Sequence, residues 1–200
     1  MEKAATRDGY GKALLELGKK NLDVVALDAD LSDSTRSEYF AKQFPNRFFS
    51  MGIAEQNMIG AAAGLAFSGK IPYASTFAIF SERAYEFVRN IVSRNKLNVK
   101  IAGSHAGIFT GEDGKSAQAI EDIAAYRALP NMVVLQPCDS VECEKMVFAL
   151  ADYKWPSYMR MHRNPVPIIH GSDYKFEIGK GELLRQGKDA VIFATGTLVH

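Results

Sequence analysis

The 200-residue sequence has little of what would direct a chain to a membrane, to nucleic acid or to an oxidising compartment. Its two cysteines, Cys138 and Cys143, are too few and too poorly spaced for a zinc site or a disulfide framework. A net charge of +1 provides no overall field for nucleic acid or an anionic membrane surface. No apolar run reaches membrane-spanning length, and no signal segment opens the chain. We expect a reduced, cytoplasmic setting with no nucleic acid and no membrane among its partners.

Common motifs of nucleotide, acyl and calcium chemistry are also absent. The sequence contains no G-x-x-x-x-G-K-S/T loop to cradle a phosphate and no G-x-S-x-G nucleophile elbow. The GEDG segment at 111–114 lacks the spaced acids and the closing Glu of an EF-hand loop. Its composition by itself favours a turn.

What is present is the patterning of a globular α/β chain, with 47% hydrophobic and 24% charged residues. Helices are expected over 6–20, 55–68, 80–95, 118–129 and 140–153, with a further short helix ending near Pro45. Strands are expected over 22–30, 47–51, 71–76, 98–104, 132–137 and 156–161. This alternation predicts a mostly parallel open sheet with helices on both faces.

Polar residues follow the predicted strands where each strand ends. Asp28 and Asp30 close one strand, Glu55 follows the next, and the segments 75–80 and 103–117 follow two more. Ligands of open parallel sheets bind beyond the carboxyl ends of the strands, so these residues should gather at one edge. For Glu55 the structural alternative is an acid placed in a first helical turn by the helix dipole.

Two aromatic residues and an arginine, Phe77, Phe80 and Arg83, lie three apart at this predicted edge. They are either core residues or a flat apolar slot for a planar ring. Among the histidines, only His105 lies at a strand end beside glycines, whereas His162 and His170 are expected on the surface.

The predicted helix at 55–68 contains Gly60, Ala61, Ala62, Ala63 and Gly64. Each helical Gly costs roughly 1 kcal/mol relative to Ala, which suggests a packing or functional reason for keeping two. Our hypothesis is that another polypeptide packs closely against this helix.

The C-terminal part of the sequence differs from the rest. The composition predicts a domain over 1–169 and a polar linker over 170–188. Residues 189–197, DAVIFATGT, have the pattern of a strand and turn, so 189–200 is interpreted as the start of a further α/β domain that is truncated or missing.

Three segments in order, GIAEQNM, STFAIFSERA and GSHAGIFTGEDG, resemble the pyrimidine-binding domain of transketolases. The resemblance extends over residues 4–169 and includes ATR at 5–7, DADLSDST at 28–35 and MHRNP at 161–165. Pyruvate dehydrogenase beta chains and deoxyxylulose-phosphate synthases share the acid and the sheet, but they are less similar across GSH and GEDG. The resemblance implies the thiamine-diphosphate-binding fold.

The resemblance also implies cofactor roles. The carboxylate at Glu55 would hydrogen-bond N1′ of the aminopyrimidine of thiamine diphosphate, so that the 4′-imine can remove the thiazolium proton and the cofactor can act as electron sink. Phe77 and Phe80 would form the slot for the pyrimidine ring. Arg83 falls at a third slot position that varies in the family, and Asp30 lies near an acid beside the cofactor.

Substrate roles follow from the same resemblance. Arg7, Ser34, His105 and Arg163 match positions that hold the substrate phosphate, and His105 joins Glu55 as an expected catalytic residue. Asp113 matches an acid that binds a substrate hydroxyl. The sequence departs from the family at Ala117, where a His or Gln is common, which leaves the acceptor preference open.

The family binds diphosphate and magnesium with a separate domain that carries a Gly-Asp-Gly, a segment this sequence does not contain. We therefore expect the C-terminal subunit of a split transketolase, active only with an N-terminal partner subunit that holds diphosphate and Mg²⁺, and associating as a dimer or heterotetramer. The expected substrates are sugar phosphates of pentose phosphate metabolism. The alternatives are a relative with another donor, such as a deoxyxylulose-phosphate-synthase-like half, and a non-catalytic partner subunit.

Overall fold

The computed structural model describes residues 1–200 and contains a parallel six-stranded sheet in the order β3-β2-β4-β5-β7-β6. The strands are β2 (Val24–Asp28), β3 (Phe48–Ser50), β4 (Ile71–Phe77), β5 (Lys100–Ser104), β6 (Val133–Leu135) and β7 (Ser157–Arg160). A short antiparallel pair, β1 (Lys3–Ala4) and β8 (Val166–Pro167), lies beside it. The predicted fold class is confirmed.

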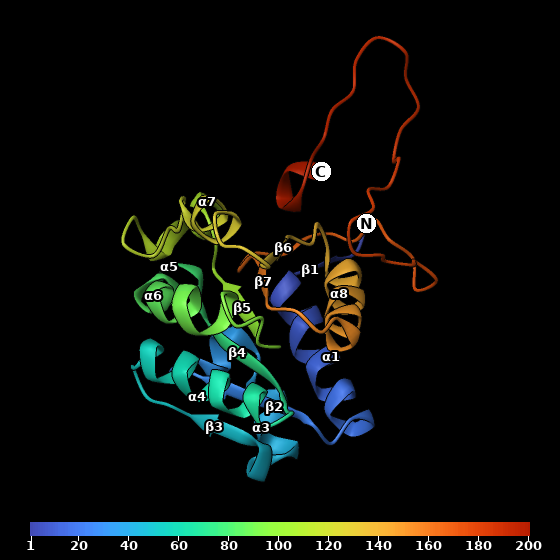
Figure 1. The fold of residues 1–200 in the computed structure, drawn as a ribbon. Helices are drawn as coiled ribbons and strands as arrows, with labels where there is room; N and C mark the ends of the chain where they lie inside the picture. The colour runs from blue at the N-terminus through green and yellow to red at the C-terminus, as the bar shows by residue number, and fades with distance from the viewer.

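Helices cover both faces of the sheet, as Figure 1 shows. On one face lie α1 (Thr6–Lys20), α3 (Glu38–Gln43) and α8 (Ser140–Asp152); on the other lie α4 (Glu55–Phe67), the helical segments after β4, and α7 (Asp122–Arg127). Strand residues alternate between the two cores: in β2, Val24 packs in the first core and Val25 in the second. Both faces are buried, which explains the near-continuous apolar runs of these strands.

The segment expected as one helix over 80–95 is divided into short pieces. These are α5 (Ala78–Ser81), a 3₁₀ turn (Glu82–Ala84), α6 (Tyr85–Phe87) and a π-helical turn (Val88–Ser93). A regular helix over 80–95 would place Ala84, Phe87, Val88 and Ile91 on one apolar face, but only Ala84 and Val88 are buried, whereas Phe87 and Ile91 are 36% and 38% exposed. A π-turn has a wider period than an α-helix, and it brings Val92 into the core in their place.

The remaining connections fit the predicted outline. The short helix before Pro45 forms as α2 (Ser32–Thr35) and α3, and the Gly-rich loop after β5 contains a 3₁₀ segment (Ile108–Asp113). The helix expected over 118–129 is shorter, since α7 begins only at Asp122. No helix is long and apolar enough to cross a lipid bilayer.

The C-terminal segment contains one wrong prediction. Residues 170–188 contain no helix or strand, as a linker would, and Figure 1 shows the chain leaving the body here as an open loop. Residues 189–195 form no strand, and only a 3₁₀ turn (Gly196–Val199) follows. A strand pattern needs a neighbouring strand to complete its hydrogen bonds, and none lies beside this segment. The further domain stays a prediction.

Candidate active site

Glu55 is the first residue of α4 and lies beyond the carboxyl end of β3. Gly52, with φ +66°, allows the chain to turn sharply between the two elements. The Glu55 side chain is only 2% exposed, and its ion-pair partner is Arg83, whose Nη1 lies 3.7 Å from Oε2. A buried carboxylate at a helix N-terminus is thus held by one long contact to a side chain that is itself 54% exposed.

Arg83 begins a continuous row of stacked side chains along this edge of the sheet. Its guanidinium carbon lies 5.1 Å from the centre of the Phe80 ring. The Phe80 and Phe77 rings are stacked with centres 5.5 Å apart, and the Phe77 and His105 rings are stacked at 3.8 Å. We call these four residues the stacked row. The row connects the Glu55 carboxylate at one end to His105 at the other.

His105 follows β5 directly and adopts a left-handed backbone conformation, with φ +55°. Its Nδ1 lies 3.0 Å from Ser104 Oγ, and its Nε2 lies 3.5 Å from Arg7 Nη1. Because arginine can only donate, Nε2 is the acceptor and Nδ1 carries the proton. Burial, reinforced by the charges of Arg7 and Arg163, lowers the pKa of His105 to about 3. The ring is therefore neutral at neutral pH and adds no positive charge to the expected phosphate site.

Arg7, near the start of α1, faces the same end of the row. It donates to the Ser34 carbonyl oxygen at 2.8 Å, so Ser34 contributes its backbone to this contact. Arg7 Nε is buried without a hydrogen-bond partner. Burial, and then the neighbouring Arg36, lowers the pKa of the Arg7 guanidinium from its usual value. A buried, unpaired donor on a cation is a group that an anion would satisfy.

Arg163 and Asp113 form a second pair near His105. Arg163 Nη1 lies 3.5 Å from Asp113 Oδ1 and also contacts Glu112. Arg163 belongs to the segment after β7, whereas both acids belong to the 3₁₀ turn after β5. The two neighbouring strands therefore bring the expected phosphate-binding cation and the expected hydroxyl-binding acid together at one place.

Residues 2–168 match the family described as the transketolase pyrimidine binding domain. The chain belongs to this transketolase family. A protein of Methanocaldococcus jannaschii named as a transketolase C-terminal section is 55% identical over 193 residues, which are 95% of this chain and 61% of that protein. Human transketolase is 38% identical over 202 residues, covering 100% of this chain and 32% of the human protein.

Solved transketolase structures agree with this assignment. A structure described as "Split gene transketolase, inactive beta4 tetramer" superposes with a TM-score of 0.89 at 51% identity, covering 98% of this chain and 64% of that one. Transketolase from Campylobacter jejuni superposes with a TM-score of 0.79 at 29% identity, over 85% of this chain and 27% of that one. The chain therefore spans less than two thirds of each of these relatives.

Asp30 and Ala117, which the resemblance also singles out, take no part in the contacts described above. Asp30 follows β2, is exposed and adopts a left-handed conformation with φ +63°, and its cofactor role stays a prediction. Ala117 is buried, and its N–H donates to the Gly114 carbonyl oxygen at 3.0 Å.

Two residues of this edge were not singled out from the sequence. Ser104 holds the Nδ1 side of His105, and Glu112 shares Arg163 with Asp113. The adjacency of Ser104 to His105 in the GSH segment is a usable signal for the first. Nothing local to Glu112 indicates that Arg163, which is distant in the sequence, would reach it.

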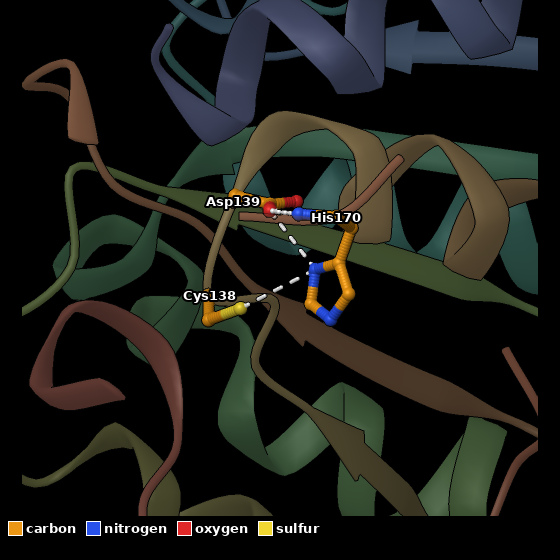
Figure 2. Close-up of side chains that lie close together, drawn as sticks. All are labelled: Cys138, Asp139 and His170. Atoms are coloured by element: carbon orange, nitrogen blue, oxygen red, sulfur yellow. Dashed lines mark hydrogen bonds and ion pairs between the residues drawn. The ribbon is translucent and has the colours of Figure 1, made fainter. Parts of the chain in front are cut away.

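A second polar cluster, Cys138, Asp139 and His170, lies beside the N-terminus of α8 (Figure 2). Asp139 Oδ1 accepts the Glu142 N–H at 2.8 Å, and Oδ2 accepts the N–H groups of Ile169 and His170 and the His170 ring, each at 2.9 Å. The thiol of Cys138 lies 3.8 Å from His170 Nδ1, and burial raises the pKa of that thiol. These bonds fasten the segment after β8 to α8, and they leave no free carboxylate oxygen for a metal ion.

The expectation that His162 and His170 are surface residues is wrong. His162 is 2% exposed, and its Nε2 lies 3.2 Å from Gln136 Nε2. Burial lowers the pKa of His162 to about 4. The His170 ring is enclosed between Asp139 and Glu182. Both histidines lie in segments with little regular structure that nevertheless pack against the body of the domain.

Proposed function

We propose that this chain is the C-terminal subunit of a split transketolase. Such an enzyme transfers a two-carbon ketol group between ketose and aldose phosphates with thiamine diphosphate. The observation that carries the proposal is the position of Glu55, buried at the carboxyl edge of the sheet and connected through the stacked row to His105 and Arg7. This arrangement combines a proton-sharing acid, a set of planar rings and an anion-binding end.

The residues at this edge fit an aminopyrimidine. Glu55 has a single charged partner at 3.7 Å, so its oxygens can accept a closer hydrogen bond from a protonated ring nitrogen. Phe77 and Phe80 are half-buried. Phe80 and His105 cover the faces of Phe77, so a planar heterocycle would stack on the Phe80 face where Arg83 now lies. The diphosphate and Mg²⁺ belong, in this proposal, to an N-terminal partner subunit, because no group of carboxylates gathers at this edge of the chain to hold the metal.

When bound, thiamine diphosphate supplies the electron sink for cleavage of the carbon–carbon bond beside a ketose carbonyl. The residues of this chain bind and orient the pyrimidine ring and the sugar phosphate. Glu55 holds or releases a proton at the pyrimidine ring nitrogen, and the stacked row sets the plane of that ring. Arg7 and Arg163 attract the sugar phosphate, while neutral His105 accepts a hydrogen bond from Arg7 and so orients that guanidinium toward it.

In this proposal Asp113, which now pairs with Arg163, accepts a hydrogen bond from a substrate hydroxyl once the phosphate engages Arg163. This coupling favours a phosphorylated sugar over an unphosphorylated donor such as pyruvate. The two free, buried cysteines suit the reducing cytoplasm in which pentose phosphates are exchanged.

The assembly proposed for this chain involves α4. Gly64 is exposed, and an added methyl group there would meet no atom of the chain within 4 Å. The neighbouring residues Gly60 and Ala61 are only partly covered, so the middle of the outward face of α4 presents backbone and small side chains. Exposed Gln56 and Asn57 lie toward one end of this face and exposed Phe67 at the other. This is a surface that another subunit can approach closely. We propose that the chain self-associates without activity and becomes active in a heterotetramer with its partner.

The proposal is tested by purifying the chain together with an N-terminal transketolase subunit that carries the Gly-Asp-Gly magnesium motif. Activity is measured with xylulose 5-phosphate and ribose 5-phosphate. Glu55→Gln should lower kcat by about 10²–10⁴-fold in the assembled enzyme. Glu16→Gln, on the exposed face of α1, is the matched control and should leave kcat unchanged.

Two results would contradict the proposal. Turnover by this chain without a partner would exclude the split enzyme, and unchanged activity of Glu55→Gln would leave only a binding role for the chain. Replacing the donor by pyruvate and the acceptor by glyceraldehyde 3-phosphate distinguishes a related enzyme with another donor.

A further inference from the structure

Arg83 makes, with one side chain, both of the contacts that an aminopyrimidine would need at this site. Its guanidinium lies over the Phe80 ring at 5.1 Å, and its Nη1 faces the Glu55 carboxylate at 3.7 Å. A guanidinium is planar, stacks on aromatic rings and pairs with carboxylates. A protonated aminopyrimidine has the same properties, since it is a flat, delocalised cation with N–H donors in the plane of the ring.

We propose that Arg83 is a placeholder that occupies the pyrimidine position until the cofactor enters. The inference rests on the proposed function, because it assumes that Glu55 and Phe80 receive the aminopyrimidine. It changes the role expected for Arg83 from a contact of the bound ring to a competitor of that ring. The cofactor and the guanidinium cannot occupy the same carboxylate and the same ring face together.

The difference in burial between Glu55 and Arg83 explains why a placeholder is needed and why it can leave. Glu55 is 2% exposed, and an unpaired buried carboxylate is costly. Arg83 neutralises that charge while the site is empty. Because its own side chain is 54% exposed, it can turn outward into water when the cofactor arrives, without burying or breaking anything else.

The charged groups around Glu55 also support the placeholder role of Arg83. The guanidinium is the only cationic partner of Glu55, whereas the other arginines of the segment after β4 are engaged elsewhere: Arg89 pairs with Glu86 through two hydrogen bonds. Arg89 lies on the same stretch of chain and is similarly exposed, at 43%. It therefore provides a matched control that removes one arginine without touching the stacked row.

The test is a binding titration of the full chain with 4-amino-5-hydroxymethyl-2-methylpyrimidine, a probe that needs no diphosphate site. At pH 8 the free probe is uncharged, and on binding it takes up from solvent the proton that its ring nitrogen shares with Glu55. Dissociation constants are measured by calorimetry or ligand-observed NMR for the wild type, Arg83→Ala, Arg83→Lys and Arg89→Ala. Arg83→Ala should bind the probe on the order of threefold to tenfold more tightly, as expected for loss of one partly exposed ion pair and one exposed cation–π contact. Arg89→Ala should bind like the wild type.

Salt provides a readout that a purely structural role would not change. Raising ionic strength screens the exposed ion pair, so the wild type should bind the uncharged probe more tightly in high salt. Arg83→Ala should show no such gain, and Arg83→Lys, which keeps the charge without the planar group, should lie between them. Adding Glu55→Gln to Arg83→Ala should abolish the improvement.

Equal or weaker binding by Arg83→Ala, including no detectable binding by either protein, would overturn the placeholder. This failure is distinct from failure of the proposed function. If the assembled enzyme turns over xylulose 5-phosphate but Arg83→Ala does not bind the probe more tightly, only the placeholder role is disproved. If Arg83→Ala binds the probe more tightly in a way that requires Glu55, but the assembled protein shows no turnover, the transketolase activity is disproved and the placeholder role stands.

Discussion

Gly64 allows the proposed subunit interface to be tested separately from the stability of the domain. It lies inside α4, and an added Cβ would meet no atom within 4 Å. Gly64→Ala should therefore gain the full helix-propensity difference of about 1 kcal/mol. For a domain of this size that corresponds to a rise in Tm of about 2–4 °C. Thermal unfolding of the isolated chain at low concentration measures it.

Gly9 provides the contrast, because it also lies inside a helix but has no free space. A Cβ at Gly9 would lie 2.3 Å from the Ser140 carbonyl oxygen, at the start of α8. The same propensity gain is then outweighed by overpacking, which costs about 1–3 kcal/mol or more. Gly9→Ala should unfold at a lower temperature than the wild type.

The assembly assay uses Gly64→Leu, which adds a large side chain to the outward face of α4. The isolated chain should fold normally, while its association with the partner subunit should weaken in sedimentation or size-exclusion measurements. Gly60→Leu is a less clean variant, since a Cβ there lies 3.7 Å from the Phe87 ring and a leucine would also disturb the domain. Unchanged assembly of Gly64→Leu, or a lower Tm for Gly64→Ala, would refute the reasoning.

Two further predictions concern the histidine at the end of the row and the cluster at α8. The pKa of His105 is lowered to about 3 in the folded chain, so the unfolded chain binds the proton first and stability should fall as pH drops below about 6.5, by up to about 1.4 kcal/mol per pH unit. Urea unfolding at pH 7.5 and 5 should show this loss, His105→Asn should reduce it, and a ring that titrates near 6.5 by NMR would contradict it. Asp139→Ala removes the acceptor of four hydrogen bonds and should lower the free energy of unfolding by about 2–4 kcal/mol, whereas exposed Asp173→Ala should not. Added Zn²⁺ should leave the Tm of the wild type unchanged, and a rise would show that the cluster binds metal.

The sequence pattern is sufficient for the sheet and for the gathering of the candidate residues at one edge of it. Buried parallel strands are apolar on both faces, so segments such as 22–30 are visible without any knowledge of their neighbours. Glu55 was recognisable as the start of a helix after a strand, and the edge rule placed it with Phe77 and His105. These predictions depend on local patterns, which a single sequence records well.

What could not be predicted depends on contacts between distant segments. Burial lowers the pKa of His105, and the charges of Arg7 and Arg163, which are distant from it in the sequence, lower it further. His162 is buried by packing that its own neighbours do not reveal, with its backbone N–H bonded to Thr6 Oγ1. The pattern at 189–197 records a preference for strand, but only a neighbouring strand could realise it.

The stacked row also makes this edge of the sheet rigid. Its three rings, Phe80, Phe77 and His105, have few rotamers and stack in order, so the length of this part of the row is set by ring-to-ring contact. The rings form a spacer that ends beside Arg7 and stays in place when Arg83 turns outward. A subunit built this way has ordered this part of its edge before any second polypeptide arrives, so docking would not have to spend ordering entropy on it.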